Sequence, residues 1–446
     1  MYENIAAIST APGTGGVAII RISGNAVLQT AEKMFRPTGK TAVKDFVPYK
    51  MYPGEILADG FTDYGLCVFF KAPHSYTGED TVEFQCHGGT AIARGVLKAT
   101  LANGCRLAEK GEFTKRAFLH GKLSLSSAEG VIDMINGQSQ SELKAGYFLY
   151  SEKLTKQIKS LQDRLTLVMA GIEADIDYPE EEVEAESLAA TLEELKLIHA
   201  ELARLVASYS VGKKIKHGVN CAIAGKPNTG KSSLLNALLG YEKAIVSDVA
   251  GTTRDTVEGS MDIDGVRFNL YDTAGIRKSD DKIEAIGIDR AKRMTLGADV
   301  ILFVLDSSAP YTEEDKLVYE SIREKPHVVV YNKTDKDANA LTDAPKADIR
   351  ISAATGENLD SLCNLLRERG AGTAGEGNFL TEERHYAALK EAAARMEKVL
   401  HDFELVPTDM LTIELSAAWE KLGEISGETA NERIIDEIFS KFCVGK

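Results

Sequence analysis

The sequence has few cysteines, no long apolar run and no excess of positive charge, and each shortage excludes a class of protein. Its 446 residues include six cysteines, none in C-x-x-C spacing, which disfavours a zinc site or a disulfide framework and predicts a reducing cytosol. No stretch approaches the roughly 18 apolar residues that indicate a membrane span. The first residues show no basic segment followed by an apolar core, so we expect no secretory signal. These absences predict a cytoplasmic protein without a membrane partner.

The charge balance limits how the chain could contact a nucleic acid. The formal net charge is −15, whereas non-specific affinity for nucleic acids comes from neutralising phosphates. Any such contact therefore needs a local basic patch or a second protein. The length suits roughly three domains, and a composition of 44% hydrophobic and 27% charged residues is that of an ordinary globular protein.

Residues 225–232 (GKPNTGKS) are the most informative segment, because they match the phosphate-binding loop G-x-x-x-x-G-K-S. An apolar strand is predicted before them, at 219–224, and a helix after them, at 233–239. In this context backbone N–H groups cradle phosphates, Lys231 reaches the outer phosphates and the Ser232 hydroxyl binds Mg²⁺. The segment predicts a nucleotide site.

Three further motifs follow in the order that a guanine-nucleotide switch protein requires. Residues 272–275 (DTAG), 332–335 (NKTD) and 352–354 (SAA) each follow a predicted strand. The Asp335 carboxylate only accepts hydrogen bonds, so it suits a base edge with two donors, which guanine has and adenine lacks. Asp272 is expected to hold Mg²⁺ through water. Together the motifs predict GTP rather than ATP.

Between these motifs, residues 251–255 (GTTRD) make the chain resemble the TRAFAC-class translation-factor-like GTPases, and the MnmE (TrmE) family of tRNA-modifying GTPases most closely. The resemblance implies that Thr253 joins Ser232 at Mg²⁺ and that a potassium ion is held by Asn228, Ser247, Val249 and Thr252. The family usually has Thr where this chain has Ser247. The nucleotide-binding residues that the resemblance implies are Asn228, Thr229, Gly230, Lys231, Ser232, Ser233, Ser247, Asp248, Val249, Ala250, Gly251, Thr252, Thr253, Asp272, Thr273, Ala274, Gly275, Asn332, Lys333, Asp335, Ser352, Ala353 and Ala354.

The residue after DTAG makes a potassium ion chemically attractive. Ile276 stands where many GTPases carry a water-orienting Gln, and an apolar side chain can neither orient water nor stabilise charge. A monovalent cation beside the phosphates could replace an arginine finger, which is worth about 10³–10⁵ in rate elsewhere. The family's water-orienting Glu corresponds to Glu284, so we expect Glu284 and Lys231 to be catalytic. From its surroundings alone, Glu284 could equally be a solvated surface carboxylate.

Three N-terminal segments also match the MnmE pattern: residues 12–24 (PGTGGVAIIRISG), 75–83 (SYTGEDTVE) and 111–119 (GEFTKRAFL). The family's N-terminal domain resembles a tetrahydrofolate-binding fold and dimerises. Its folate contacts correspond to Arg21, Glu83, Lys122 and the terminal Lys446. A carboxylate can accept two hydrogen bonds from a pterin ring, and basic groups suit the glutamate tail. Without the resemblance these residues would be surface charges, and residues 13–16 a tight turn.

The chain organisation predicts a multidomain α/β and α protein. We expect an N-terminal α+β folate-binding-like domain at 1–120 and a helical domain that is split into 121–215 and 372–446. A Ras-like P-loop GTPase is inserted at 216–371, since the termini of such domains lie close together. Apolar spacing with almost no helix breakers predicts helical structure over 143–174, and Thr381 is expected to cap the helix that follows it.

The C-terminal tail, residues 442–446 (FCVGK), departs from the family's Phe-Cys-Ile-Gly-Lys only at Val444. The resemblance places Cys443 near the tRNA-modification site; Cys443 either acts near the reacting base or only orders the tail. The family works as a homodimer, joined through the N-terminal domain, and as a heterotetramer with the FAD-containing MnmG protein. The two modify the tRNA wobble uridine at carbon five with 5-formyl- or 5,10-methylene-tetrahydrofolate.

We therefore expect a potassium-dependent GTP hydrolase that uses GTP/GDP, Mg²⁺ and K⁺. The alternatives are a ribosome-assembly GTPase of the Era or Der kind, and a folate-binding scaffold with a degenerate GTPase. The first alternative leaves the first 210 or so residues unexplained, and the complete nucleotide motifs count against the second.

Overall fold

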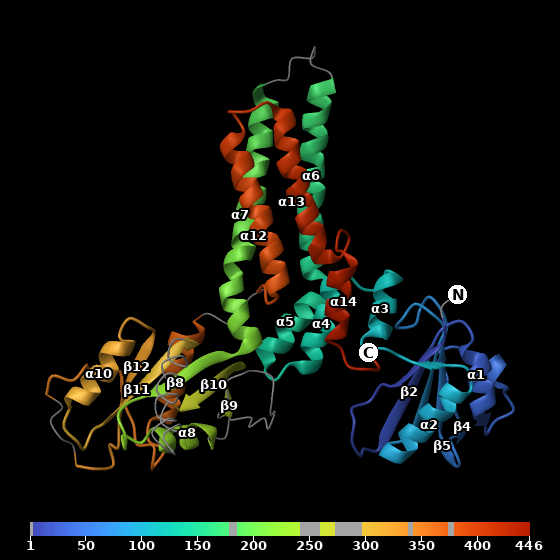
Figure 1. Cartoon of the computed structure of the whole chain (residues 1–446), viewed down its shortest axis with the longest axis horizontal. Coiled ribbons are helices and arrows are strands. Elements are labelled where there is room, and N and C mark those ends of the chain that lie inside the picture. Colours follow the sequence, from blue (N-terminus) through green and yellow to red (C-terminus); the bar gives the residue numbers. More distant parts are fainter. Residues whose placement is uncertain (1–2, 178–184, 241–258, 273–296, 338–341, 373–378) are drawn as a thin grey trace, which may run out of the picture. The chain divides into compact units, whose positions relative to one another are not determined.

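The chain forms two compact units, each built from segments that lie far apart in the sequence (Figure 1). The computed structural model describes residues 3–177, 185–240, 259–272, 297–337, 342–372 and 379–446. The first unit comprises Met1–Ile132, Leu149–Tyr178 and Leu415–Lys446, and the second comprises Asp133–Phe148 and Pro179–Glu414. Among the described residues, no helix is both long and apolar enough to cross a membrane. The division into three domains, one of them split, stays a prediction.

The first unit contains a seven-stranded sheet in the order β3-β4-β5-β6-β2-β1-β7. Side chains on alternate positions of its strands, such as Ile20, Ile22 and Phe84, pack with helices α1 and α2 in one apolar core. The strands are β1 (Ile5–Ile8), β2 (Val17–Ser23), β3 (Phe35–Pro37), β4 (Met51–Leu57), β5 (Thr62–Phe70), β6 (Thr81–His87) and β7 (Arg106–Leu107). The helices are α1 (Val27–Met34), a 3₁₀ turn (Val43–Asp45) and α2 (Thr90–Ala102).

The register of this sheet determines which residues occupy its second face. Arg21 on β2 lies directly opposite Glu83 on β6, and Glu83 lies opposite Val68 on β5. Because side chains alternate between faces, all three point away from the core that contains Ile20 and Ile22. The face opposite the apolar core therefore carries two of the predicted folate residues, Arg21 and Glu83.

The elements that follow β7 in the chain, up to residue 177, are helical, and so is α14; most of α5 belongs to the second unit. Helix α3 (Glu112–Leu119) contacts α14 (Glu432–Ser440), where the rings of Phe118 and Phe439 lie 6.1 Å apart. The helical stretch predicted over 143–174 is confirmed, but it consists of two helices. The structure has α5 (Gln140–Tyr150) and α6 (Lys153–Asp177), because Glu152 between them has a left-handed φ of 59°, which an α-helix does not accommodate. Helix α4 spans Leu125–Asn136.

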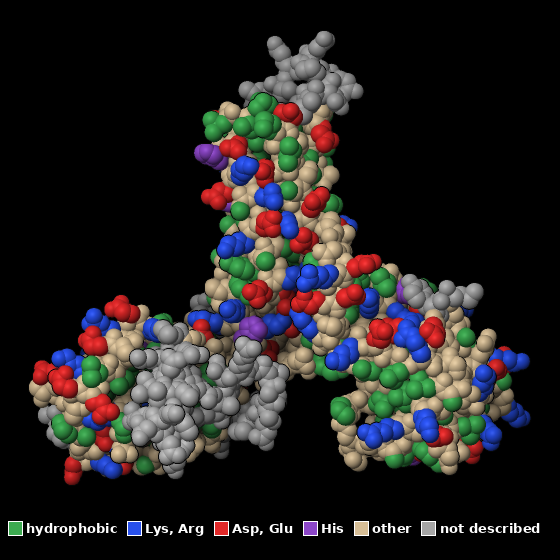
Figure 2. Space-filling model, viewed as in Figure 1, with side chains coloured by type: hydrophobic (Ala, Val, Ile, Leu, Met, Phe, Trp, Pro, Cys, Tyr) green, Lys and Arg blue, Asp and Glu red, His purple; other side chains and the backbone are tan. Residues whose placement is uncertain are grey.

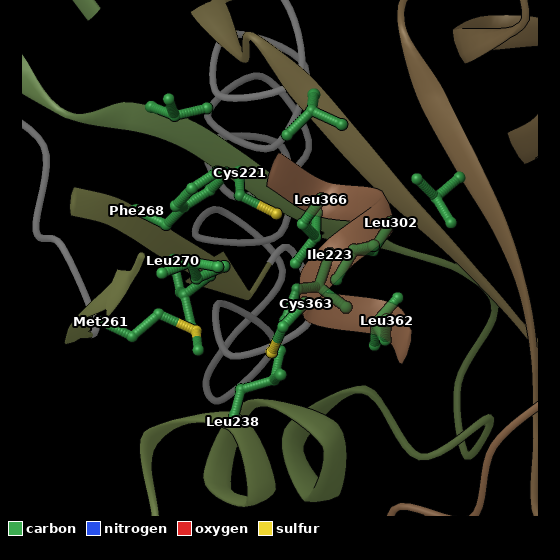
Figure 3. Packing of buried hydrophobic residues seen from close by; sticks show 14 of the residues in the cluster. Cys221, Ile223, Leu238, Met261, Phe268, Leu270, Leu302, Leu362, Cys363 and Leu366 are labelled. Carbon is green, nitrogen blue, oxygen red and sulfur yellow. The ribbon is translucent and has the colours of Figure 1, made fainter. Parts of the chain in front are cut away.

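The second unit contains a six-stranded sheet in the order β13-β12-β11-β8-β10-β9, parallel except for β9. One face packs on α8 and α11, as Figure 3 shows for Leu238 and Leu362 against the sheet residues Ile223 and Leu302. The other face packs on α10. The strands are β8 (Val219–Ala224), β9 (Gly259–Ile263), β10 (Val266–Asp272), β11 (Val300–Asp306), β12 (His327–Asn332) and β13 (Ile349–Arg350). The helices are α8 (Lys231–Leu239), α10 (Glu313–Ile322) and α11 (Leu359–Leu366), followed by a π-helical turn (Arg367–Ala371).

Two long helices of the second unit pack against each other. One ends where the GTPase segment begins, and the other begins shortly after that segment ends. These are α7 (Ala185–His217) and α12 (Glu383–Asp402), and the rings of Tyr209 and Tyr386 stack 4.3 Å apart between them. Lys216, close to the end of α7, forms ion pairs with Asp133, at 2.9 Å, and with Glu382. Helix α13 spans Thr408–Ser426. The predicted N-cap at Thr381 is wrong: Glu382 is the N-cap of α12, while Thr381 is buried.

Candidate functional site

The nucleotide motifs meet at one edge of the parallel sheet in the second unit. Strand β8 has β10 on one side and β11 on the other, so connections leave it in opposite directions. Open α/β sheets bind ligands outside the carboxyl ends of their strands at such a switch point. The loop 225–230 follows β8 at that edge, and Asp272 and Asn332 end the nearby strands β10 and β12.

The backbone of the loop explains both glycines of the motif. Gly225 and Gly230 have φ values of 152° and 94°. A Cβ at Gly225 would lie 2.4 Å from the Val304 carbonyl oxygen, and one at Gly230 would lie 2.3 Å from Asn332 Nδ2. A side chain at either position would therefore force the loop away from its neighbours. Asn228, between them, is also left-handed, with φ 65°.

The first turn of α8 presents the groups expected to bind phosphate and Mg²⁺. Lys231 is 4% exposed, and its Nζ donates to the carbonyl oxygens of Gly225, at 2.8 Å, and Lys226, at 2.7 Å. The Ser232 hydroxyl donates to Asp272 Oδ2 at 2.7 Å. A hydroxyl and a carboxylate this close are hard oxygen donors of the kind that Mg²⁺ prefers. The described side chains therefore fit a magnesium ion at Ser232, with Asp272 beside it.

The guanine motifs are joined to the phosphate loop by hydrogen bonds. Asn332 Nδ2 donates to the Thr229 carbonyl at 3.0 Å, while its Oδ1 accepts from the Ala353 N–H at 3.0 Å. Lys333 Nζ donates to the Asn228 carbonyl at 2.6 Å. The two residues therefore bind directly to the loop that would hold the phosphates.

Asp335 is exposed at this edge and accepts a hydrogen bond from the Ser352 hydroxyl at 2.6 Å. That hydrogen bond lowers the pKa of Asp335, which keeps its carboxylate an acceptor at neutral pH. Ser233 on α8 and Ala354 after β13 are also exposed near these motifs in the sequence. The structure thus brings together the described members of the predicted nucleotide set.

Several predicted residues lie outside the described residues. They are Ser247, Asp248, Val249, Ala250, Gly251, Thr252, Thr253, Thr273, Ala274, Gly275, Ile276 and Glu284. Of the four predicted potassium ligands, the structure describes Asn228.

A second polar cluster lies on the sheet of the first unit. Arg21 Nε donates to Glu83 Oε1 at 2.7 Å, and the two side chains are 16% and 12% exposed. The Arg21 guanidinium carbon lies 5.4 Å from the ring centre of Tyr76 and 5.7 Å from that of Phe113. Burial, and then the charge of Arg21, lower the pKa of Lys446, whereas Glu83 raises it. Arg21, Glu83 and Lys446 are therefore close enough to interact.

The tail reaches this cluster because it packs on the residues before α3. Val444 forms an antiparallel bridge with Lys110, and the Gly111 N–H donates to the Cys443 carbonyl at 3.4 Å. Cys443 itself is exposed, whereas the other five cysteines are buried. Lys122 instead donates to the Pro73 carbonyl at 3.0 Å. His87 pairs with Asp63 at 2.7 Å.

Two residues that contact the nucleotide motifs could not be recognised from those motifs. Asp306 Oδ2 accepts from Lys333 at 2.6 Å, and Asp315 Oδ2 accepts from Lys226 of the phosphate loop at 2.6 Å. Asp306 ends the buried strand β11 at the same sheet edge. An acidic residue in that position was the available signal for a functional role.

The face drawn in Figure 2 shows how charge is distributed over the second unit. Basic and acidic side chains are interleaved along the long helices α7 and α12. This mixture agrees with the acidic net charge of the chain. A tRNA contact on these helices would need a small group of basic residues rather than a broad basic face.

Comparisons with known proteins match the whole chain. Residues 4–122 match the family "GTP-binding protein TrmE N-terminus", and residues 125–443 match "MnmE helical domain". Proteins named tRNA modification GTPase MnmE from Finegoldia magna and Aquifex aeolicus are 38% and 39% identical, over 100% of both chains in each case. A crystal structure of an Aquifex aeolicus Era variant bound to GDP·AlF4⁻ is 32% identical over 40% of this chain and 66% of that chain, with a TM-score of 0.28. We draw no conclusion from a structural likeness of that score.

Proposed function

This chain belongs to the MnmE family of tRNA modification GTPases, and we propose that it couples potassium-dependent GTP hydrolysis to modification of the tRNA wobble uridine. The observation that carries the GTPase half is the meeting of Lys231, Ser232, Asp272 and Asn332 at one sheet edge. Family membership carries the tRNA half. The full-length match counts against a ribosome-assembly GTPase of the Era or Der kind.

In the hydrolysis that we propose, the chain binds both ends of GTP. The N–H groups of the loop and of the α8 N-terminus face the phosphates, and Lys231 supplies positive charge to the outer ones. Asp335 accepts from the guanine ring N–H and amino group, and the backbone at Ala353 and Ala354 donates to the guanine oxygen. Thr253 is proposed to join Ser232 at Mg²⁺, which would neutralise charge on the transferring phosphoryl group.

Potassium is proposed to stabilise the remaining charge. Asn228, Ser247, Val249 and Thr252 would hold it; Asn228 is left-handed, and its carbonyl already accepts from Lys333. We therefore assign the potassium contact of Asn228 to its side-chain oxygen. Glu284 is proposed to orient the attacking water, since Ile276 cannot.

The first unit is proposed to bind 5-formyl- or 5,10-methylene-tetrahydrofolate. Glu83, paired with Arg21, offers a carboxylate for the donors of a pterin ring, and Lys446 and Lys122 offer positive charge for the glutamate tail. The rings of Tyr76 and Phe113 beside Arg21 supply apolar surface for a flat ligand. The bound folate would supply the one-carbon unit.

We propose a homodimer through the N-terminal domain and a heterotetramer with the FAD-containing MnmG protein, acting on tRNA in the cytoplasm. Val17, Met51 and Tyr64 support the dimer, because the register places them on the second face of the first unit's sheet and they are more than half exposed. With its partner the chain would install an aminomethyl or carboxymethylaminomethyl group on carbon five. Cys443, exposed on the docked tail, is proposed to lie near the reacting base.

Mass spectrometry of tRNA nucleosides from a deletion strain tests this proposal. Reintroducing the wild-type chain should restore the modified wobble uridine. Cys443→Ser, which loses thiolate chemistry but keeps the size of the side chain, should hydrolyse GTP normally yet fail to restore it. A deletion strain with unchanged nucleosides would contradict the tRNA function. Full restoration by Cys443→Ser would leave the tail only a packing role.

A further inference from the structure

The phosphate loop is held from outside its own motif by the connection between β11 and α10. This connection carries an acidic residue at each end: Asp306 ends β11, and Asp315 lies in the first turn of α10. Each accepts a hydrogen bond from a lysine that belongs to or contacts the phosphate loop. Neither aspartate belongs to a nucleotide motif.

The first contact joins Asp315 to Lys226, the second residue of the loop. Lys226 Nζ donates to Asp315 Oδ2 at 2.6 Å, and the side chains are 17% and 1% exposed. The same oxygen accepts from the N–H of Thr312, at 2.9 Å, and from its hydroxyl, at 2.8 Å. Asp315 is thus fixed by the capping box of α10, so the position of this helix determines where the Lys226 side chain lies.

The second contact joins Asp306 to Asn228 through Lys333. Asp306 Oδ1 accepts from the N–H and hydroxyl of Ser308, at 2.9 and 2.7 Å, which orients the carboxylate. Its Oδ2 accepts from Lys333 Nζ at 2.6 Å, and that nitrogen also donates to the Asn228 carbonyl at 2.6 Å. The carboxylate therefore holds the lysine against the one non-glycine residue of the loop with a left-handed backbone.

We propose that Asp306 and Asp315 form a P-loop clamp, in which both act as positioning residues for the nucleotide and potassium sites. The clamp holds the loop at residues 226 and 228, between the two glycines that let its backbone bend. The Lys226 carbonyl accepts from Lys231 Nζ and from the Thr229 hydroxyl, at 3.1 Å. Displacing residue 226 would therefore also displace the lysine that serves the phosphates.

The clamp matters because the loop conformation is costly to maintain. A left-handed backbone at a non-glycine residue such as Asn228 is sparsely populated and persists only where its surroundings favour it. Hydrogen bonds to charged groups in partly buried positions are among the strongest available for that purpose. Without the clamp, the loop should relax, bind GDP less firmly and present Asn228 less often to a cation. The last effect rests on the potassium site proposed above.

GDP release from the full-length protein tests the clamp. A fluorescent GDP analogue should dissociate about tenfold faster or more from Asp306→Asn than from wild type, because an amide cannot hold Lys333 as a carboxylate does. Lys226→Met should give a similar increase in the GDP release rate. This variant tests the contact between Lys226 and Asp315 even if Asp315→Asn fails to fold, because the buried Asp315 keeps its hydrogen bonds from Thr312. The double variant Asp306→Asn, Lys226→Met should be non-additive, since both changes free one loop.

The matched control is Asp348→Asn. Asp348 lies in the same unit, is 24% exposed, and accepts from Arg369 and from the Val329 N–H. It should change GDP release by no more than about twofold, as surface substitutions usually do. The clamp is contradicted if Asp306→Asn and Lys226→Met release GDP at the wild-type rate, or if Asp348→Asn accelerates release as much as they do.

A potassium titration of GTP hydrolysis separates the clamp from the potassium proposal. Asp306→Asn should require more potassium for half-maximal turnover, and Asp348→Asn should not. If wild type shows no potassium dependence, the proposed potassium site fails while the GDP release rates still decide on the clamp. If wild-type turnover depends on potassium and Asp306→Asn needs the same potassium concentration for half-maximal turnover, the clamp does not position Asn228.

Discussion

The nucleotide site and the N-terminal charge cluster are built in different ways. At the nucleotide site, main-chain geometry places the functional groups: two glycines bend the loop, α8 begins at Lys231, and strand ends place Asp272 and Asn332. In the N-terminal cluster, contacts between side chains place the functional groups. Arg21 and Glu83 face each other across two strands, and Lys446 joins them from the end of the chain.

This difference determines how each site should respond to change. A site placed by the main chain keeps its shape when a side chain that contacts the ligand is altered, so such substitutions should remove single functions; changes to the P-loop clamp are the exception, because they loosen the loop itself. A site assembled from paired charges loses its arrangement when either member of a pair is removed, because the charge of the remaining member is then uncompensated.

Replacing potassium with sodium should have the largest effect and should be confined to the nucleotide site. We expect GTP turnover to fall by up to about a thousandfold, the lower range of an arginine finger's contribution, while GDP binding changes little. Asn228→Ala should have the same effect in potassium. Equal single-turnover rates in the two salts would remove the potassium site, and an unchanged rate for Glu284→Ala would return that residue to a surface role.

Asp335→Asn should weaken GTP binding by about tenfold or more, because an amide nitrogen would face guanine donors. The same variant should gain affinity for xanthosine triphosphate, whose base has an oxygen where guanine has its amino group. Displacement of a fluorescent GDP analogue measures both affinities. Folate binding should not change. Unaltered guanine preference would show that Asp335 does not contact the base.

Much of the nucleotide site could be predicted from the sequence, because its motifs are contiguous and each follows an apolar strand. The two aspartates of the P-loop clamp could not, since they belong to no motif: Asp315 lies 89 residues from Lys226, and Asp306 reaches the loop only through Lys333, 27 residues away. Packing also decided two local features. A left-handed Glu152 divides the helical stretch predicted over 143–174, and Thr381 is buried instead of capping α12. For the N-terminal cluster, only the pairing of β2 with β6 places Arg21 opposite Glu83.

Arg21→Ala should reduce 5-formyltetrahydrofolate binding by about tenfold, because it leaves Glu83 without its partner and Lys446 with a different local charge. The matched control is Lys98→Ala, which removes an exposed ion pair with Asp59 in the same unit; it should leave folate binding unchanged. A folate titration followed by fluorescence measures both. Equal affinities for wild type and Arg21→Ala would place the folate elsewhere.

The pH dependence of stability should differ in sign between two partly buried acids. Burial would raise the pKa of Glu112, but hydrogen bonds from Arg106, the Glu109 N–H and Arg116 lower it to about 2. The stability that ionised Glu112 contributes is present above the ordinary Glu pKa of 4.5 and is lost as the pH falls toward 2. Burial, followed by the charge of Glu382, raises the pKa of Asp133. The stability that protonated Asp133 contributes is therefore lost as the pH rises above the ordinary Asp pKa of 3.8.

Thermal unfolding midpoints between about pH 3 and 8 test these signs. Glu112→Gln should make the protein less sensitive to acid, and Asp133→Asn should reduce the loss of stability toward neutral pH. The same slope in wild type and Asp133→Asn would show that Asp133 is ionised beside Lys216 throughout this range.

The central claim is that one chain carries two separate sites, a nucleotide site and a folate site. Calorimetric titration of wild type, Asp335→Asn and Arg21→Ala with GTP and with 5-formyltetrahydrofolate tests it most directly. Asp335→Asn should lose GTP affinity and keep folate affinity, and Arg21→Ala should show the reverse. A variant that loses both ligands together, or wild-type protein that binds only one of them, would contradict the account.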